Sequence, residues 1–151
     1  MQYMMEPKDL IKYFYRSDIF AVQADNGSYY LVKRSLTPQD LQDHIDGKVT
    51  LGAYQVKDET VQWAVIDFDS YDYKDTIYSI AQDLSANFEV EIEDSGQKGY
   101  HIWIWFLEPQ PMFMIYDFLH GVLADYGLKP GFKSHIDIFP RAPYFKEKLR
   151  K

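Results

Sequence analysis

VQWAVIDFDS, the stretch from Val61 to Ser70, predicts a buried strand that ends in two acids. Apolar residues occupy both sides of its period-two pleat, as expected of a central strand that is covered on both faces. Asp67 and Asp69 lie two positions apart, so their carboxylates point the same way, about 6.5 to 7 Å apart along the strand. Such a pair can share divalent cations, and it can equally begin a turn or cap a helix.

The composition bounds the class of protein. The chain has 151 residues, 46% of them hydrophobic and 17% aromatic, which excludes disorder and allows one domain with a sizeable core. It has no cysteine, no apolar run long enough to span a bilayer and no signal-like N-terminus, so we expect a soluble cytoplasmic protein. We treat residues 1–151 as a single catalytic domain.

Charge is spread unevenly along the chain. The formal net charge of -7 argues against a general coat for nucleic acid. From residue 129 onward, however, two acids, Asp137 and Glu147, stand against seven basic residues: Lys129, Lys133, Arg141, Lys146, Lys148, Arg150 and Lys151. A basic tail of this kind is usually a solvated terminus, and it is also a candidate contact for nucleic acid.

The first third of the chain predicts a small α/β segment. Residues 7–16 have the apolar spacing of a short helix, and the Asn26-Gly27 pair indicates a hairpin turn between two strands. Thr37-Pro38-Gln39-Asp40 predicts a capped helix start. A strand is expected over residues 51–56, turning back into a hairpin that would place it beside the acidic strand.

The remainder alternates helices and strands. Helices are expected over residues 75–86 and 109–126, and strands over 88–92, 102–107 and 134–139. A loop from Asp94 to His101 with two glycines, a serine and a lysine connects two of these strands. Glycines let backbone N–H groups approach an anion, and the side chains can bond phosphate oxygens, although such turns are most often simple hairpins.

Four further residues stand out chemically. Asp137 lies between two isoleucines in a strand that we expect to be too apolar for an exposed edge, so it should need a partner. His101 shares its strand face with Trp103 and Trp105. The histidine is either a satisfied polar group or a ligand, and the tryptophans are either core residues or a surface for stacking bases.

In their order these motifs resemble the catalytic core of the archaeo-eukaryotic primase superfamily, in particular the primase-polymerases of bacterial conflict, mobile-element and CRISPR-associated systems. The family's h-D-h-D motif corresponds to Ile66 to Asp69, its S-x-H loop to Ser95 to His101, and its third acidic motif to Ile136-Asp137. The resemblance extends from about Asp18 to Arg141.

The resemblance implies an α+β fold with an RRM-like sheet core and an N-terminal α/β extension. It also implies a DNA or RNA primase-polymerase, a nucleotidyltransferase of DNA replication type that uses nucleoside triphosphates, a template or primer and two Mg²⁺ or Mn²⁺ ions. The implied catalytic and metal-binding residues are Asp67, Asp69 and Asp137, and the implied nucleotide-binding residues are Ser95, Gly96, Lys98, Gly99 and His101. Family members continue into a further strand, so we expect a missing C-terminal portion; a larger protein assembly is possible.

Two other interpretations are open. IDFDS resembles the first motif of haloacid-dehalogenase-type phosphatases, but these require an acidic pair near the end of the chain, and Ile136 to Phe139 does not supply one. The second is a non-catalytic module that binds nucleotide or single-stranded nucleic acid through Trp103, Trp105 and the basic tail.

Overall fold

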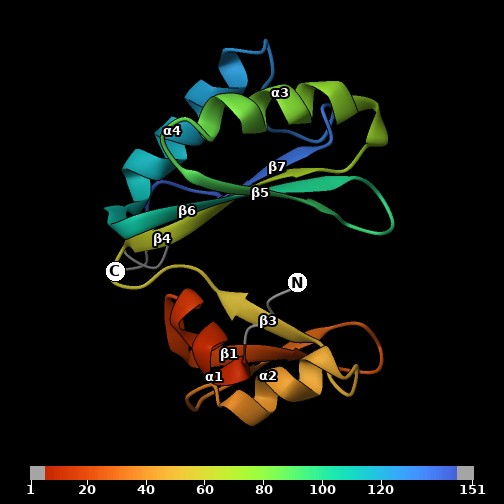
Figure 1. Cartoon of the computed structure of the whole chain (residues 1–151), viewed down its shortest axis with the longest axis vertical. Coiled ribbons are helices and arrows are strands. Elements are labelled where there is room, and N and C mark those ends of the chain that lie inside the picture. The colour runs from red at the N-terminus through yellow and green to blue at the C-terminus, as the bar shows by residue number, and fades with distance from the viewer. Residues whose placement is uncertain (1–5, 146–151) are drawn as a thin grey trace. The chain divides into compact units, whose positions relative to one another are not determined.

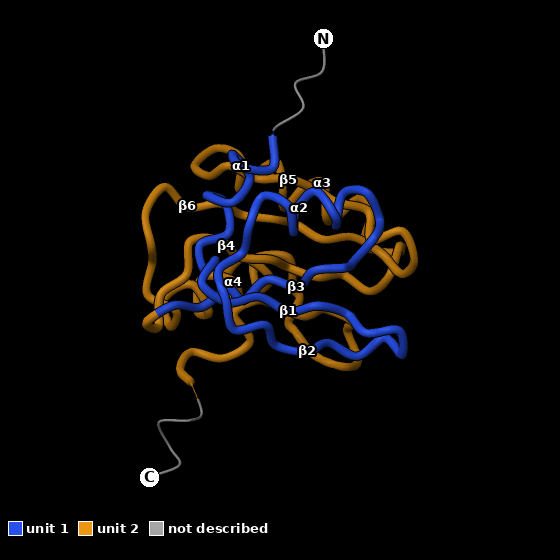
Figure 2. Tube along the Cα trace, turned by 90° about the horizontal axis from the view of Figure 1, so that it is seen from below, with its two compact units in different colours: residues 1–57 blue, residues 58–151 orange. Residues whose placement is uncertain are grey.

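A computed structural model describes residues 6–145 of the chain. Contacts concentrate in two compact units, residues 1–57 and residues 58–151 (Figure 2). Each unit has an antiparallel sheet of its own, three-stranded in the first and four-stranded in the second. The helices and strands of each unit come from its own part of the sequence.

The first unit is a small α/β structure, and its strands run in the order β2-β1-β3. The expected hairpin is confirmed, since β1 and β2 pair on either side of the turn, where Gly27 has a φ of 88°. The expected N-terminal helix is shorter than predicted and ends in a 3-10 turn. The elements are α1 (Pro7–Leu10), η1 (Ile11–Tyr13), β1 (Arg16–Gln23), β2 (Tyr29–Val32), α2 (Pro38–Ile45) and β3 (Leu51–Tyr54).

A capping box begins α2, as the sequence predicts. The backbone N–H of Asp40 donates to the Thr37 hydroxyl at 3.2 Å, and the Thr37 N–H donates to the Asp40 carboxylate at 2.8 Å. The Arg34 guanidinium lies 2.7 Å from the same carboxylate and holds the pKa of Asp40 well below its usual range. The helix buries Leu41 against Phe20, so this unit has its own hydrophobic cluster.

The predicted hairpin between residues 51–56 and the acidic strand is wrong. β3 pairs with β1 in the first sheet, with Gly52 opposite Ala21. The acidic strand, β4 (Thr60–Phe68), has neighbours on both sides within the second sheet. A strand can pair with only two others, so no edge of β4 is open to β3.

The second unit is a four-stranded antiparallel sheet in the order β5-β6-β4-β7. β4 is therefore a central strand, as predicted, although the described helices of this unit cover one face of the sheet and not both. The α+β class is confirmed. The other elements are η2 (Tyr71–Tyr73), α3 (Lys74–Leu84), β5 (Glu89–Asp94), β6 (Tyr100–Pro111), α4 (Met112–Ala124) and β7 (Ile136–Phe139).

Both helices of this unit cover the same face of its sheet (Figure 1). Ile66 and Phe68 of β4 point to that face and are fully buried, as are Ile77 and Ile80 of α3 and Leu119 of α4. Burying one such side chain stabilises the folded state by about 1.5 to 3 kcal/mol. Because side chains alternate along a strand, the residues between these, including Asp67, lie on the opposite face of the sheet.

Helix α4 begins three residues later than predicted. β6 continues through Pro111, which pairs with Thr60, and the N–H of Met112 donates to the Glu59 carbonyl at 2.8 Å. Pairing with β4 therefore keeps this segment extended. None of the helices within residues 6–145 is long and apolar enough to cross a membrane.

Candidate active site

The register of the second sheet aligns the predicted motifs in one row. Asp67 on β4 is paired with His101 on β6 and with Asp137 on β7. On the far side of β6, His101 is paired with Glu93 of β5. Residues that oppose each other across antiparallel strands share a face, so four titratable side chains from four strands lie side by side on the face that the helices leave uncovered.

Asp67 is the centre of this row and is the least solvated of its acids. One carboxylate oxygen, Oδ1, is buried without a hydrogen-bond partner, and Nε2 of His101 lies 3.3 Å from it. Burial raises the pKa of the Asp67 carboxyl; the charge of His101 opposes this effect, and those of Asp69 and Asp137 add to it. A positively charged ligand strongly stabilises a buried carboxylate that lies beside two like charges.

His101 lies between two carboxylates. Its Nδ1 is 2.6 Å from Oε1 of Glu93, and the same oxygen accepts a hydrogen bond from the Trp103 indole at 3.1 Å. The ring is therefore oriented by β5 on one side and by Asp67 on the other. The sequence analysis missed Glu93; the available signal was the alternation of Glu89, Glu91 and Glu93 along one strand face.

Asp137 is more exposed than predicted, because β7 is an edge strand of the sheet. The expectation that this strand was too apolar for an edge is wrong: its isoleucines face the helices, and its carboxylate faces away from them. Asp137 Oδ1 accepts the Ile138 N–H at 2.9 Å, and Oδ2 lies 2.7 Å from Nη2 of Arg141. The sequence analysis counted Arg141 only as part of the basic tail.

Asp69 follows directly after β4. Its backbone N–H donates to the carbonyl of His135 at 2.8 Å, which ties the end of β4 to the loop that precedes β7. His135 itself has a φ of 59°, the left-handed region that few residues other than glycine adopt. The first and third acidic motifs are thus joined through the backbone as well as by strand pairing.

The Ser95 hydroxyl organises the S-x-H loop. It accepts hydrogen bonds from the N–H groups of Lys98 and Gly99, at 3.1 and 2.9 Å. Gly96 has a φ of 80° and makes the turn. Gly99 lies so close to the end of β4 that an added Cβ would be 1.9 Å from the Phe68 carbonyl oxygen. The second glycine therefore allows the loop to pack against the acidic motif.

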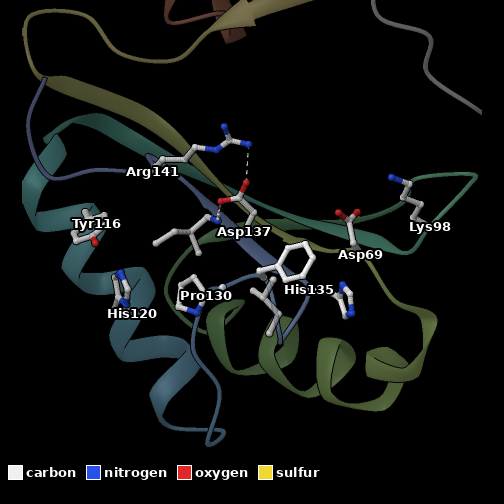
Figure 3. Close-up of a pocket in the computed structure, with 12 residues that line it drawn as sticks. Asp69, Lys98, Tyr116, His120, Pro130, His135, Asp137 and Arg141 are labelled. Carbon is white, nitrogen blue, oxygen red and sulfur yellow. Dashed lines mark hydrogen bonds and ion pairs between the residues drawn. The ribbon is translucent and has the colours of Figure 1, made fainter. Parts of the chain in front are cut away.

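A cavity of about 810 Å³ opens beside β7 (Figure 3). It is lined by three predicted site residues, Asp69, Lys98 and Asp137, together with Arg141. Asp67, Ser95 and His101 do not line it. Its other walls come from α4 and the segment leading into β7, and comprise Tyr116, His120, Pro130, Gly131, Phe132, His135, Ile136 and Ile138. The sequence analysis had singled out none of these other residues as site residues.

The three aspartates have the chemistry of a divalent-cation site, since Mg²⁺ and Mn²⁺ prefer carboxylate oxygens. The buried Oδ1 of Asp67, which accepts no hydrogen bond, fits such a ligand. As they stand, however, no three His, Asp or Glu side chains within residues 6–145 are grouped closely enough to hold a metal. The three aspartates thus offer the type of donor atom that such an ion prefers. One of them, Asp137, is paired with Arg141.

The chain also matches a known protein family. Residues 30–148 match the family described as "TOTE conflict system, Archaeo-Eukaryotic Primase domain". The match covers most of the chain and includes all three acidic positions and the S-x-H loop. The chain therefore belongs to the archaeo-eukaryotic primases, and the domain it matches within them is that of the TOTE conflict system. Comparison with curated proteins gives no match.

Proposed function

We propose that this protein is a metal-dependent primase-polymerase, a nucleotidyltransferase that adds nucleoside triphosphates to a DNA or RNA strand. The observation that carries the proposal is the pairing of Asp67 with Asp137 on adjacent strands, with Asp69 immediately beyond. The family match over residues 30–148 supports a primase-like activity. In the reaction a strand hydroxyl attacks the α-phosphorus of the nucleotide, and pyrophosphate leaves.

We also propose that the second unit is an RRM-like core. Its elements follow the order β-α-β-β-α-β, and its first and third strands are the central ones. Both features support the assignment. On this interpretation, residues 1–57 are the N-terminal α/β extension.

Asp67, Asp69 and Asp137 would hold the divalent ions. When bound, Mg²⁺ or Mn²⁺ supplies activation of the attacking hydroxyl and neutralises charge on the departing pyrophosphate. The protein's part is to hold the three carboxylates on or just beyond the adjacent strands β4 and β7, which the pairing of these strands and the Asp69 backbone bond support. The raised pKa of Asp67 reflects burial and crowding that a cation would relieve.

The S-x-H loop would hold the triphosphate. Lys98 lines the cavity together with Asp69 and offers a mobile point charge. The Ser95 oxygen accepts two backbone N–H groups, which leaves its own O–H available to donate to a phosphate oxygen. His101 would have to exchange one carboxylate partner for a phosphate. The backbone of Gly96 and Gly99 fixes the shape of the loop.

The non-catalytic alternative, a nucleic-acid module that uses Trp103 and Trp105, is less well supported. Their rings stack 5.8 Å apart, but Glu91 and Glu89 are paired opposite them on β5, and Glu93 binds the Trp103 indole. Negative charge on that face would repel a phosphate backbone. The family match likewise does not favour the phosphatase interpretation.

Primer extension tests the proposal. We expect the wild type, given a primed template, labelled nucleotides and Mn²⁺, to lengthen the primer, and Asp67→Asn, Asp69→Asn and Asp137→Asn each to abolish extension, because the metal site acts as a unit. Glu91→Gln, on the same sheet face, is the matched control and should retain activity. Retention of about a tenth or more of wild-type activity by all three aspartate variants would refute the assignment. Nucleotide binding without extension in the wild type would favour the non-catalytic module.

A further inference from the structure

Among residues 6–145, Arg141 is the one arginine that lines the cavity beside the acids (Figure 3). Its guanidinium lies 2.7 Å from Oδ2 of Asp137 and 4.8 Å from the centre of the Phe139 ring. The Arg141 side chain is 67% exposed and that of Asp137 is 39% exposed. The arginine is thus held at the rim of the cavity by one ion pair and one ring contact, both within solvent reach.

This ion pair conflicts with metal binding at Asp137. A guanidinium at 2.7 Å places a positive charge where a dication would have to approach. The other oxygen of Asp137 already accepts the Ile138 N–H. Oδ1 of Asp67 accepts no hydrogen bond, whereas both oxygens of Asp137 are engaged, one by the Ile138 N–H and one by Arg141. The third ligand must therefore lose its arginine before it can bind a cation fully.

We infer that Arg141 is an exchangeable partner of Asp137: it holds the carboxylate in the metal-free protein and transfers to the oligophosphate in the cavity when a divalent cation takes the carboxylate. This inference rests on the proposed function. Because exposed ion pairs are weak, breaking this one costs little free energy. A planar guanidinium binds phosphate as well as carboxylate. Lys98 lines the same cavity, so the released guanidinium would bind the anion beside a second cation.

A purely structural role for Arg141 predicts a different outcome. If Arg141 only stabilises the edge strand, its removal should lower the stability of the fold and leave the ligand affinities unchanged. An exchanging arginine predicts changes of opposite sign, with tighter binding of the cation and weaker binding of the oligophosphate. Lys133→Met is the control for a general electrostatic effect. Lys133 carries the same charge in the segment leading into β7, is exposed and does not line the cavity.

The test measures Mn²⁺ affinity by titration calorimetry on the full chain, without nucleotide. We expect Arg141→Met to bind Mn²⁺ about two- to fivefold more tightly than the wild type, equivalent to about 0.4 to 1 kcal/mol, the range for an exposed ion pair. Lys133→Met should change the affinity less. In an Asp137→Asn background, Arg141→Met should have no further effect, because the partner of Arg141 is absent.

The second measurement uses tripolyphosphate in the presence of saturating Mn²⁺. Arg141→Met should bind it at least about tenfold more weakly, because a charge-assisted contact is lost. Unchanged Mn²⁺ affinity, or a gain no larger than that of Lys133→Met, would overturn the exchange, as would unchanged tripolyphosphate affinity. Primer extension by the wild type in either case would leave the proposed function standing, whereas its absence together with absent Mn²⁺ binding would refute both.

Discussion

Gly99→Ala should separate the S-x-H loop from the acidic strand. A Cβ at this position would lie 1.9 Å from the Phe68 carbonyl oxygen and 2.7 Å from the Ser70 nitrogen, whereas real Cβ contacts essentially never fall below 3.0 Å. Both neighbours are backbone atoms at the end of β4, so neither can rotate away. The loop and the strand end must therefore part by about 1 Å, at a cost of about 1 to 3 kcal/mol, as for other overpacked sites.

Thermal unfolding measures this cost. For a chain of this size we expect a melting temperature lower by about 2 to 12 °C, at 2 to 4 °C per kcal/mol. Amide resonances from Asp67 to Ser70 should shift, and tripolyphosphate affinity should fall, because Lys98 moves relative to the acids. The control is Gly96→Ala: that glycine has a φ of 80° and no atom near its would-be Cβ, so it carries backbone strain without displacing β4. A wild-type melting temperature and unshifted β4 resonances in Gly99→Ala would refute the reasoning.

The remaining predictions concern charges in the site. Burial raises the pKa of the Asp67 carboxyl. The stability that this carboxyl contributes to the folded state is therefore fully present below its ordinary pKa, and it is lost as the pH rises through the raised value. In EDTA, Asp67→Asn should therefore raise the free energy of unfolding at pH 7 by about 0.5 to 1 kcal/mol, and urea denaturation should show this gain shrinking in acid; a loss at pH 7 would contradict it. Lys98→Ala and His101→Ala should each weaken nucleoside-triphosphate binding by about 1.5 to 3 kcal/mol in calorimetry, and unchanged affinity would make the loop purely structural.

The central strand and the helices could be predicted because their signals are local. Apolar residues on both sides of β4 predicted a central strand, and the capping box of α2 is formed by neighbours within four residues. The spacing of Ile77, Ile80 and Leu84 likewise identified α3, whose apolar stripe is buried as expected. In each case the signal that identifies the element lies in residues close in sequence.

Strand partners were not predictable in the same way. A period-two pattern fixes which residues share a face but does not identify the neighbouring strand or the register. Residues 51–56 were predicted to pair with the acidic strand that follows them, yet β6 and β7 occupy both sides of β4. The pairing of β4 with β6 also shifts between Val61 and Trp63, and no local signal marks that irregularity.

The sequence by itself determined the chemistry of the site: two acids after a buried strand, a glycine loop with a serine, a lysine and a histidine, and a third acid in a later strand. Tertiary structure alone decided that Asp67 lies between His101 and Asp137, that Glu93 orients the histidine and that Arg141 neutralises the third acid. The physical reason is that residue types are read directly from the chain, whereas these contacts depend on strand registers set by long-range hydrogen bonding and by packing of the opposite sheet face against α3 and α4.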